Sequence, residues 1–435
     1  MANIPQPSLF CYQNVENLGD LERLDLLLKT LDDEQLMQTL EKRRGNGRDD
    51  YPIRASWNSM LAGIVFGHNT IEALRRELSR NGQLRDICGF DPLKEHPVPS
   101  SNAYTNLLKS LMEYPAEVAG IFQNLLECLA RELPGFGQRI AIDSKVIQSA
   151  ANSGSENKPD GRRDTDGGWA TKTYTDKNGK IIKKTTIFGY KVHLAVDANY
   201  ELPIARIVTP GNDNDMLEAY NLVDACPSKA LEKCEYLSAD KGYDCGDFKL
   251  WLWKEHDIRA VVDTRNMTQL EHSPVEGLDR IYYNQQGEVF CKCCKGGELN
   301  KMCNRGFEKD RDSIKFGCPA HHQGLTCPAS GSCPIGKSIR IGLEKDPRIF
   351  MALPRDSYKW KDEYKKRTSV ERVNSRLDVS FGFETHYIRG LKKMQMRVDL
   401  ALITMLGTAL GYVKTKQPHY IRSLVKSESI KISAA

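Results

Sequence analysis

The stretch LSADKGYD, Leu237–Asp244, decides which fold this chain can adopt. A short apolar run ends in Asp240, and Lys-Gly-Tyr follows at once. Such a run is typical of a buried strand, and Gly242 lets the chain turn sharply after it. A carboxylate at a strand end can hold a metal ion, or it can cap a following helix, here one expected to begin near Cys245. Both interpretations of Asp240 stay open on this stretch alone.

A second acid occupies the same kind of position, because QRIAIDSKVI (138–147) is a short apolar strand that delivers Asp143. Alternating and helical patterns predict the elements around it: strands over 187–198 and 201–210, a helix over 212–226, a strand over 234–240, a helix over 247–256 and a strand over 258–263. The order β-β-β-α-β-α-β predicts an α/β chain with a mixed sheet covered by helices, as in an RNase H-like fold. In that fold the first and fourth strands are neighbours, so Asp143 and Asp240 would meet.

The rest of the chain divides by pattern. Residues 17–135 carry apolar side chains at three- and four-residue steps, which predict an all-helical N-terminal domain. Residues 152–180 are rich in Gly, Asp and Lys and are expected to form a long mobile loop, whereas Leu400–Val413 is too short to span a bilayer and is expected to be a buried core helix. The predicted boundaries are a helical domain at 1–135, the first part of the α/β core at 136–265, a cysteine-rich insertion at 266–350, C-terminal core helices at 351–415 and a tail at 416–435.

Composition is that of an ordinary globular protein, with 40% hydrophobic and 27% charged residues. The net charge of +5 is mild, but Lys158–His193 carries nine Lys and Arg against four Asp, and Pro354–Arg397 carries twelve against six acids. Two such surpluses suggest a polyanion-binding face, although a solvated loop is the simpler explanation of either one alone. The N-terminus lacks the features of a secretory signal. We therefore expect a cytoplasmic protein without a membrane partner.

The third acid that we select is Glu371, in YKKRTSVERVNSRLD (364–378). Here the chain resembles the DDE-type transposases of bacterial insertion sequences, whose signature is Tyr, two residues, Arg, three residues, Glu, six residues, Lys. Tyr364, Arg367 and Glu371 match at these spacings, but Asp378 stands where Lys is expected. The motifs IDSK and ADKGYD also resemble the two aspartate motifs of the family, and the resemblance covers roughly residues 50–415.

The resemblance implies a chemistry. Asp143, Asp240 and Glu371 would hold two Mg²⁺ or Mn²⁺ ions that activate a water or a 3′-hydroxyl against a phosphodiester. The partner would be double-stranded DNA, cut at terminal inverted repeats and joined to target DNA by a homo-oligomer, with a dimer as the first expectation. The helical N-terminal domain would bind DNA. Taken singly each acid is more often structural, and Asp213, Asp215 and Asp244 are interpreted as caps or turn residues.

Side chains near Glu371 are predicted to contact DNA, because Lys and Arg bind phosphates and Tyr can stack on an unpaired base. Arg367 could instead merely pair with Glu371 on the helix surface. Arg372 or Arg376 could replace the missing Lys, whereas His193 is expected to be a core histidine. The predicted DNA contacts are Tyr364, Lys365, Lys366, Arg367, Arg372 and Arg376, with Lys145 and Lys191 as weaker candidates.

Seven of the thirteen cysteines crowd into residues 291–333. Crowded thiols usually bind Zn²⁺ tetrahedrally, so we predict one or two structural zinc ions, with free thiols or a redox role as alternatives. No regular spacing fixes the ligands. The candidates are Cys291, Cys293, Cys294, Cys303, Cys318, Cys327 and Cys333, with His321 and His322 nearby.

Two other functions stay open. A different RNase H-like nuclease, such as a junction resolvase, would cleave DNA without joining strands. A zinc-stabilised DNA-binding regulator with vestigial acids would bind DNA without regard to Mg²⁺ and would not cleave it.

Overall fold

The computed structural model describes residues 19–46, 50–91, 93–151, 164–175, 181–265, 271–293, 297–329 and 332–422. The chain forms two compact units. The first, here the helical unit, combines Met1–Leu133, Ile147–Gly167 and Ser375–Ala435, and the second, here the sheet unit, combines Pro134–Val146 and Gly168–Asn374. Because each unit is built from separate segments, this division does not follow the chain order on which our domain boundaries rest.

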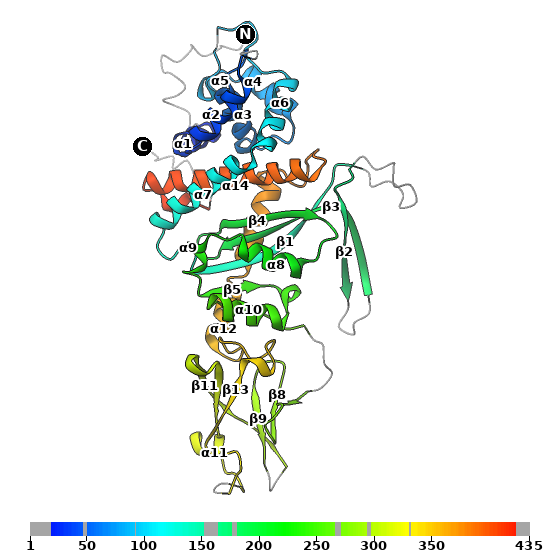
Figure 1. Cartoon of the computed structure of the whole chain (residues 1–435), viewed down its shortest axis with the longest axis vertical. Coiled ribbons are helices and arrows are strands. Elements are labelled where there is room, and N and C mark those ends of the chain that lie inside the picture. The colour runs from blue at the N-terminus through cyan, green and yellow to red at the C-terminus, as the bar shows by residue number, and fades with distance from the viewer. Residues whose placement is uncertain are drawn as a thin grey trace, which may run out of the picture. The chain divides into compact units, whose positions relative to one another are not determined.

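The helical unit is organised around α14 (Leu391–Lys414), which contacts α1 and α7 (Figure 1). Two glycines permit this close packing, since a Cβ on Gly407 would lie 2.5 Å from Leu27 and one on Gly411 would lie 2.6 Å from Leu26. By length and composition α14 could cross a membrane, but 89% of its most apolar window is buried, which confirms the predicted core helix. The other helices are α1 (Asp20–Thr30), α2 (Glu34–Arg44), α3 (Ile53–Val65), α4 (Ile71–Arg80), α5 (Gly82–Cys88), α6 (Ser101–Glu113) and α7 (Pro115–Glu132).

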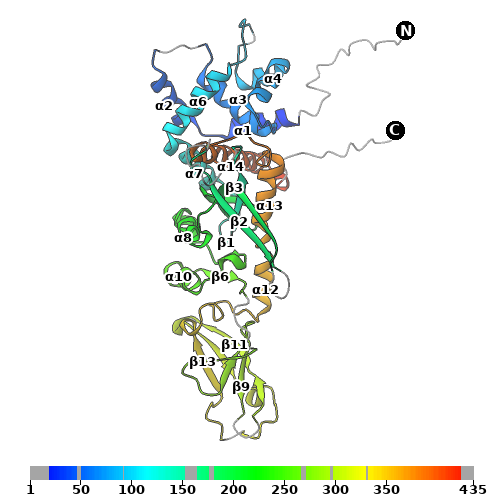
Figure 2. The ribbon, with the colours of Figure 1, turned by 90° about the vertical axis from the view of Figure 1, so that its right-hand side faces the viewer.

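The sheet unit contains a six-stranded mixed sheet, ordered β2-β3-β1-β5-β6, in which β4 also pairs with β3. Helices α8 (Asp215–Asp224) and α10 (Gly246–His256) cover one face, and α12 (Tyr358–Lys365) and α13 (Thr368–Ser375) lie on the other (Figure 2). This confirms a mixed sheet covered by helices. The strands are β1 (Arg139–Gln148), β2 (Gly168–Thr175), β3 (Ile181–Asp197), β4 (Leu202–Pro210), β5 (Tyr236–Ala239) and β6 (Arg259–Val262), with the short helix α9 (Ser228–Leu231) before β5.

Strand β2 corrects one prediction. We expected 152–180 to be a loop, but Gly168–Thr175 pairs antiparallel with the first half of β3. The sequence GWATKTYT is rich in Thr and aromatic residues, which favour strands, and the polar residues around it hid that preference. The second half of β3 pairs with β4, so β3 joins the sheet to a two-stranded ribbon. Residues 152–163 and 176–180 of the expected loop lie outside the described residues.

The cysteine-rich segment (residues 271–342) forms two antiparallel sheets, ordered β10-β9-β8-β7 and β11-β12-β13. Apolar side chains from both sheets, including Val289 and Phe316, build one buried cluster. The strands are β7 (Ser273–Pro274), β8 (Ile281–Tyr283), β9 (Val289–Lys292), β10 (Leu299–Lys301), β11 (Cys303–Glu308), β12 (Ser313–Gly317) and β13 (Ser338–Gly342), and the short helix α11 (Pro319–His322) follows β12.

Candidate active site

The two predicted aspartates lie on two neighbouring strands: Asp240 directly follows β5, whereas Asp143 lies within β1, which runs on to Gln148 instead of ending at this acid. Strands β1 and β5 are parallel and in register, with Arg139 opposite Tyr236 and Ala141 opposite Ser238. Continuing this register by two residues places Asp143 opposite Asp240. The pairing of β1 with β5 ends at Ala141 and Ser238, so both acids stand just beyond the point where the two strands pair.

Asp143 lies in an environment that disfavours its charge. Burial, together with the negative charges of Asp240 and Glu371, raises the pKa of Asp143 to about 7, while Arg367 and a hydrogen bond from the Ser144 amide (2.9 Å) oppose the rise. Charge interactions of this kind require the groups to be near one another. The fold therefore brings the three predicted acids and Arg367 into one electrostatic neighbourhood.

Asp240 is oriented by the backbone that follows it. Its carboxylate accepts a hydrogen bond of 2.6 Å from the Gly242 amide and caps the 3₁₀ turn Lys241–Tyr243. A Cβ at residue 242 would lie 2.6 Å from Oδ1 of Asp240, so only glycine leaves room for this conformation. Capping is thus present, but at this turn, because α10 begins at Gly246 after Cys245.

Glu371 stands on α13 and pairs with the arginine one turn before it. Nη1 of Arg367 lies 2.6 Å from Oε1 of Glu371, whose side chain is 50% exposed. The guanidinium of Arg367 also lies 5.7 Å from the centre of the Tyr364 ring, which stacks on Trp360. The pairing that we kept as an alternative is therefore realised in this structure.

The residue types at this edge are suitable ligands for divalent cations, but their side chains do not converge in the present conformation. Carboxylate oxygens are the ligands that Mg²⁺ prefers, and a cation would offset the repulsion that raises the pKa of Asp143. Across the described part of the chain, however, no three Asp, Glu, His or Cys side chains converge closely enough to hold one ion. In this conformation Oε1 of Glu371 is bound by Arg367 and Oδ1 of Asp240 by the Gly242 amide.

The predicted basic contacts divide into two groups. Lys365 is 74% exposed beside Asp362, and Arg367 lies at the acids. Three others pair with carboxylates: Lys191 with Asp215 (2.8 Å), Arg372 with Glu201 (2.7 Å) and Lys366 with Glu363 (3.0 Å). Arg376 belongs to the helical unit, where it contacts Met405. Lys145 is half-buried on β1.

Other residues behave as structural groups. His193 is buried and bonds Thr209 (3.1 Å), as expected of a core histidine. Asp215 pairs with Lys191 at the start of α8. Asp244 ends the 3₁₀ turn Lys241–Tyr243, as expected of a cap or turn residue, and its fully buried side chain also binds Lys249 (2.7 Å) and Arg348.

Sequence reasoning missed two neighbours of the acids. Tyr243 is buried beside Asp143, and this burial raises its pKa well above the ordinary value. Lys241 pairs with Asp263 (3.0 Å) at the end of β6. Both residues belong to ADKGYD, but their neighbours Asp143 and Asp263 are distant in the chain, so the motif alone does not reveal these contacts.

Comparisons with known proteins identify the family of the chain. The family model described as "Transposase DDE domain" matches residues 134–406. Among solved structures the chain is similar to the piggyBac transposase in its synaptic complex with hairpin DNA, at 12% identity and a TM-score of 0.38, over 93% of this chain and 79% of that one. At that score the likeness adds nothing to the assignment, and no curated protein matches. The family model spans more than half of the sequence, so the chain belongs to the DDE transposases, enzymes that use divalent metal ions to cleave DNA and transfer its strands.

Proposed function

We propose that Asp143, Asp240 and Glu371 are the metal-binding triad of this transposase and that they hold two Mg²⁺ ions. The observation that carries the proposal is the β1–β5 register, which sets Asp143 opposite Asp240. The charges of Asp240 and Glu371 both act on Asp143, which supports the same grouping. Within an RNase H-like core this sheet edge is where a phosphodiester would lie.

Bound cations supply charge neutralisation and activate the attacking oxygen, so no protein general base is required. The residues of the chain prepare that arrangement. Asp143 must lose its proton, Glu371 must exchange Arg367 for the cation, and Arg367 is then available to a phosphate oxygen. Gly242 keeps the space into which the Asp240 carboxylate turns.

The proposed substrate is the end of an insertion sequence, with terminal inverted repeats cut first and target DNA joined next. Lys365 and Arg367 contact phosphates without selecting a sequence, and Tyr364 offers a ring face to an unpaired base. Sequence recognition falls to the helical unit. A dimer acting in the bacterial cytoplasm, with zinc in the cysteine-rich segment, completes the proposal.

The test is cleavage of DNA that carries the flanking ends of the gene, with Mg²⁺ or Mn²⁺, by wild type and Asp240→Ala. We expect metal-dependent nicking and joining by wild type, and DNA binding without nicking by the variant. Asp247→Ala is the matched control, because Asp247 is an exposed acid in the first turn of α10. Cleavage without joining would favour a resolvase, and binding without cleavage under either metal would favour a regulator.

A further inference from the structure

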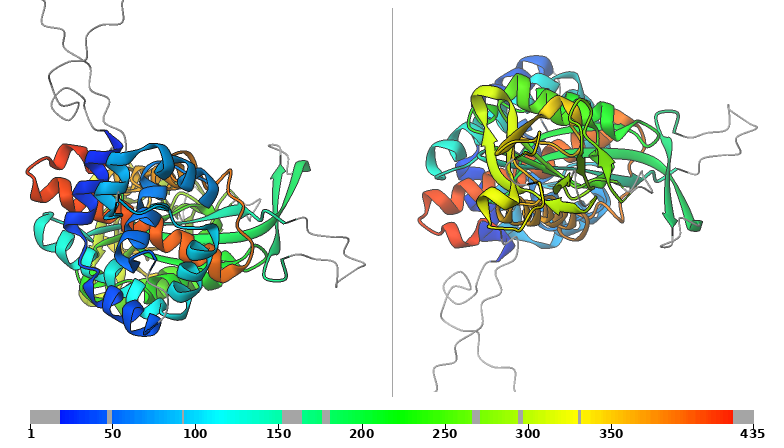
Figure 3. Two further views of the ribbon diagram at one scale, coloured as in Figure 1. Left: turned by 90° about the horizontal axis from the view of Figure 1, so that it is seen from above. Right: turned by 90° about the horizontal axis from the view of Figure 1, so that it is seen from below.

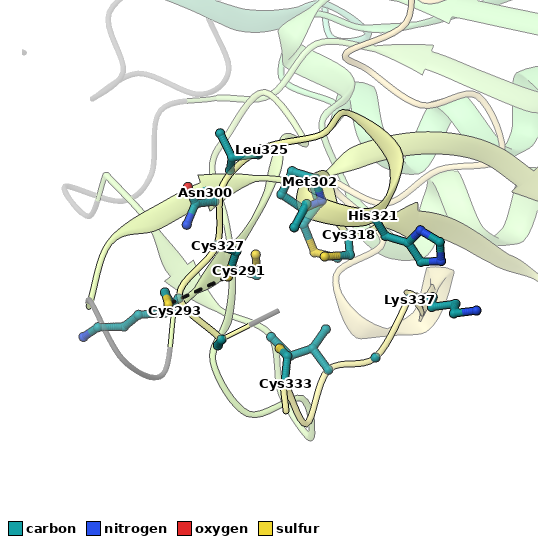
Figure 4. Close-up of a pocket in the computed structure, with 16 residues that line it drawn as sticks. Cys291, Cys293, Asn300, Met302, Cys318, His321, Leu325, Cys327, Cys333 and Lys337 are labelled. Carbon is teal, nitrogen blue, oxygen red and sulfur yellow. Dashed lines mark hydrogen bonds between the residues drawn. The ribbon is translucent and has the colours of Figure 1, made fainter. Parts of the chain in front are cut away.

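Five of the seven crowded cysteines line one pocket of about 490 Å³ in the cysteine-rich segment (Figure 4). Cys291 lies in β9, and Cys293 directly follows that strand, while Cys318 directly precedes α11. Cys327 and Cys333 lie between α11 and β13. Cys303 does not line the pocket, and Cys294 lies outside the described residues. The fold thus gathers thiols that are up to 42 residues apart, from 291 to 333.

The spacing of the sulfur atoms suits a metal rather than a disulfide. Sγ of Cys293 lies 4.0 Å from Sγ of Cys327, whereas a disulfide requires about 2.05 Å. Four thiolates placed tetrahedrally around zinc at about 2.3 Å are separated by roughly 3.8 Å. Cys291, Cys318, Cys327 and Cys333 form no disulfide. The distance between the sulfur atoms of Cys293 and Cys327 is therefore close to the length of an edge of a zinc tetrahedron.

The loop that carries two of these thiols has little else to hold it. The described residues between 323 and 337 form no helix or strand, and Ala329 is the one buried residue among them. Ile335 of this loop is partly buried and packs against the apolar cluster of the segment. Ordering such a loop costs conformational entropy that this small buried surface cannot offset, and a metal crosslink would supply the missing stabilisation.

We propose that this pocket binds one structural Zn²⁺ through Cys318, Cys327, Cys333 and one thiol of the pair Cys291 and Cys293. The two members of that pair are two residues apart at the end of one strand, so they compete for the fourth vertex. As the side chains stand, no three ligand groups converge in the described residues, so the thiols must turn inward to close the site. This zinc does not depend on the carboxylate triad.

The test is elemental analysis of the purified full chain. We expect about one zinc per chain, and less than about a tenth of that in Cys318→Ser, Cys327→Ser and Cys333→Ser, whereas only one of Cys291→Ser and Cys293→Ser should lose it. Cys303→Ser is the matched control within the segment. If a variant does not fold, its measurement is replaced by an experiment on wild type, in which cobalt is substituted for zinc and thiolate-to-cobalt absorption is the readout. A folded wild type without zinc, or one with iron and sulfide instead, would overturn the proposal.

A separate observation concerns the ribbon formed by β2 and the first half of β3 (Gly168–Thr175 with Ile181–Gly189). Figures 1 and 3 show it extending away from the rest of the six-stranded sheet. At the start of β3, Ile181 is 60% exposed and Ile182 is 69% exposed. Lys183 and Lys184, which follow them, are also exposed. Neither β2 nor the first half of β3, which together form this ribbon, contains Asp or Glu.

We infer that this ribbon enters a groove of the DNA bound by the transposase, an inference that rests on the proposed function. A two-stranded ribbon has the width of the major groove, and apolar side chains can wedge between base steps. Its positive charge and lack of acids match a duplex, the one partner that an enzyme of this family must hold.

The test uses wild type already shown to cleave its ends, so that failure of the ribbon is separate from failure of the enzyme. Lys183→Glu/Lys184→Glu should lower the salt dependence of DNA binding by about two counterions. Ile181→Ser/Ile182→Ser should remove base unstacking, followed with 2-aminopurine fluorescence. Lys233→Glu is the control, because Lys233 is an exposed lysine that precedes β5, at the end of that strand opposite Asp240. Unchanged binding and unstacking in both ribbon variants, or a change in oligomeric state alone, would overturn the inference.

Discussion

The carboxylate edge and the thiol pocket, the two metal sites that we propose in the sheet unit, reach their present geometry in different ways. At the carboxylate edge the ligands are set by a rigid feature, the register of two buried parallel strands, and their charges are offset by Arg367 and by backbone amides. In the pocket, two of the five thiols come from a loop with almost no buried surface. We therefore expect the carboxylate edge to keep its fold without a cation and the thiol pocket to depend on one.

This difference has a chemical basis. A site that exchanges cations and substrate benefits from ligands that are held by the fold and remain accessible. A structural zinc site has four protein ligands and contributes directly to folding. The proposed exchange of Arg367 for a cation at Glu371 belongs only to the first type.

The largest expected effect separates the two clusters. Glu371→Gln should lower cleavage at least about 1,000-fold, because the loss of a ligand removes several kcal/mol of transition-state stabilisation. Its zinc content should stay unchanged, whereas Cys327→Ser should lose zinc. Asp362→Asn, an exposed acid on α12, is the control for cleavage. If Glu371→Gln cleaved normally, the third ligand would lie elsewhere.

The next effect tests how firmly the fold sets the carboxylates. Gly242→Ala should lower cleavage about 100-fold, because the new Cβ would displace the Asp240 carboxylate and misplacement by about 1 Å is costly. Gly120→Ala, where a Cβ meets nothing within 4 Å, is the control. Normal cleavage by Gly242→Ala, measured under single-turnover conditions, would show that the conformation of Asp240 does not matter.

The affinity for Mn²⁺ should depend on pH, because Asp143 must be ionised to bind a cation. With the pKa of Asp143 raised to about 7, Mn²⁺ affinity should fall about tenfold for each pH unit below that value. Titration of wild type between pH 5.5 and 8 checks this. An affinity independent of pH in that range would exclude Asp143 as a ligand.

The last prediction concerns the free energy of unfolding. Replacing Asp143 should stabilise the cation-free protein, although the same change should impair cation binding. The raised pKa of Asp143 means that the folded state binds its proton more tightly than the unfolded state, so stability from this group is present at low pH and is lost as pH rises through about 7. Asp143→Asn should therefore stabilise the cation-free protein at pH 8 by up to about 4 kcal/mol, and much less at pH 5. Thermal unfolding at both pH values measures the difference, and equal effects would contradict it.

Most of the fold could be predicted because its signals are local. The apolar run before Asp240 and the alternation around His193 both lie in strands, and α14 is buried as its composition indicates. Strand β2 could not be predicted, because its partner is the extension of β3 and its polar surroundings suggested a loop. The grouping of α14 with the N-terminal helices depends on close packing at Gly407 and Gly411, which no local pattern reveals.

The candidate site could be predicted as far as the strand order brought its acids together. Sequence spacing could not show that Lys191 and Arg372 have carboxylate partners, since Asp215 and Glu201 are distant from them in the chain. For the same reason it could not separate the five pocket thiols from Cys303. Such pairings follow from tertiary contacts rather than from periodicity.

The most direct measurement is the anomalous diffraction of Mn²⁺ in crystals of the enzyme bound to a DNA end. We predict manganese peaks between Asp143, Asp240 and Glu371, with Arg367 moved from Glu371 to a phosphate. Manganese bound elsewhere, with Glu371 still paired to Arg367, would contradict the assignment of these three carboxylates as the metal-binding triad.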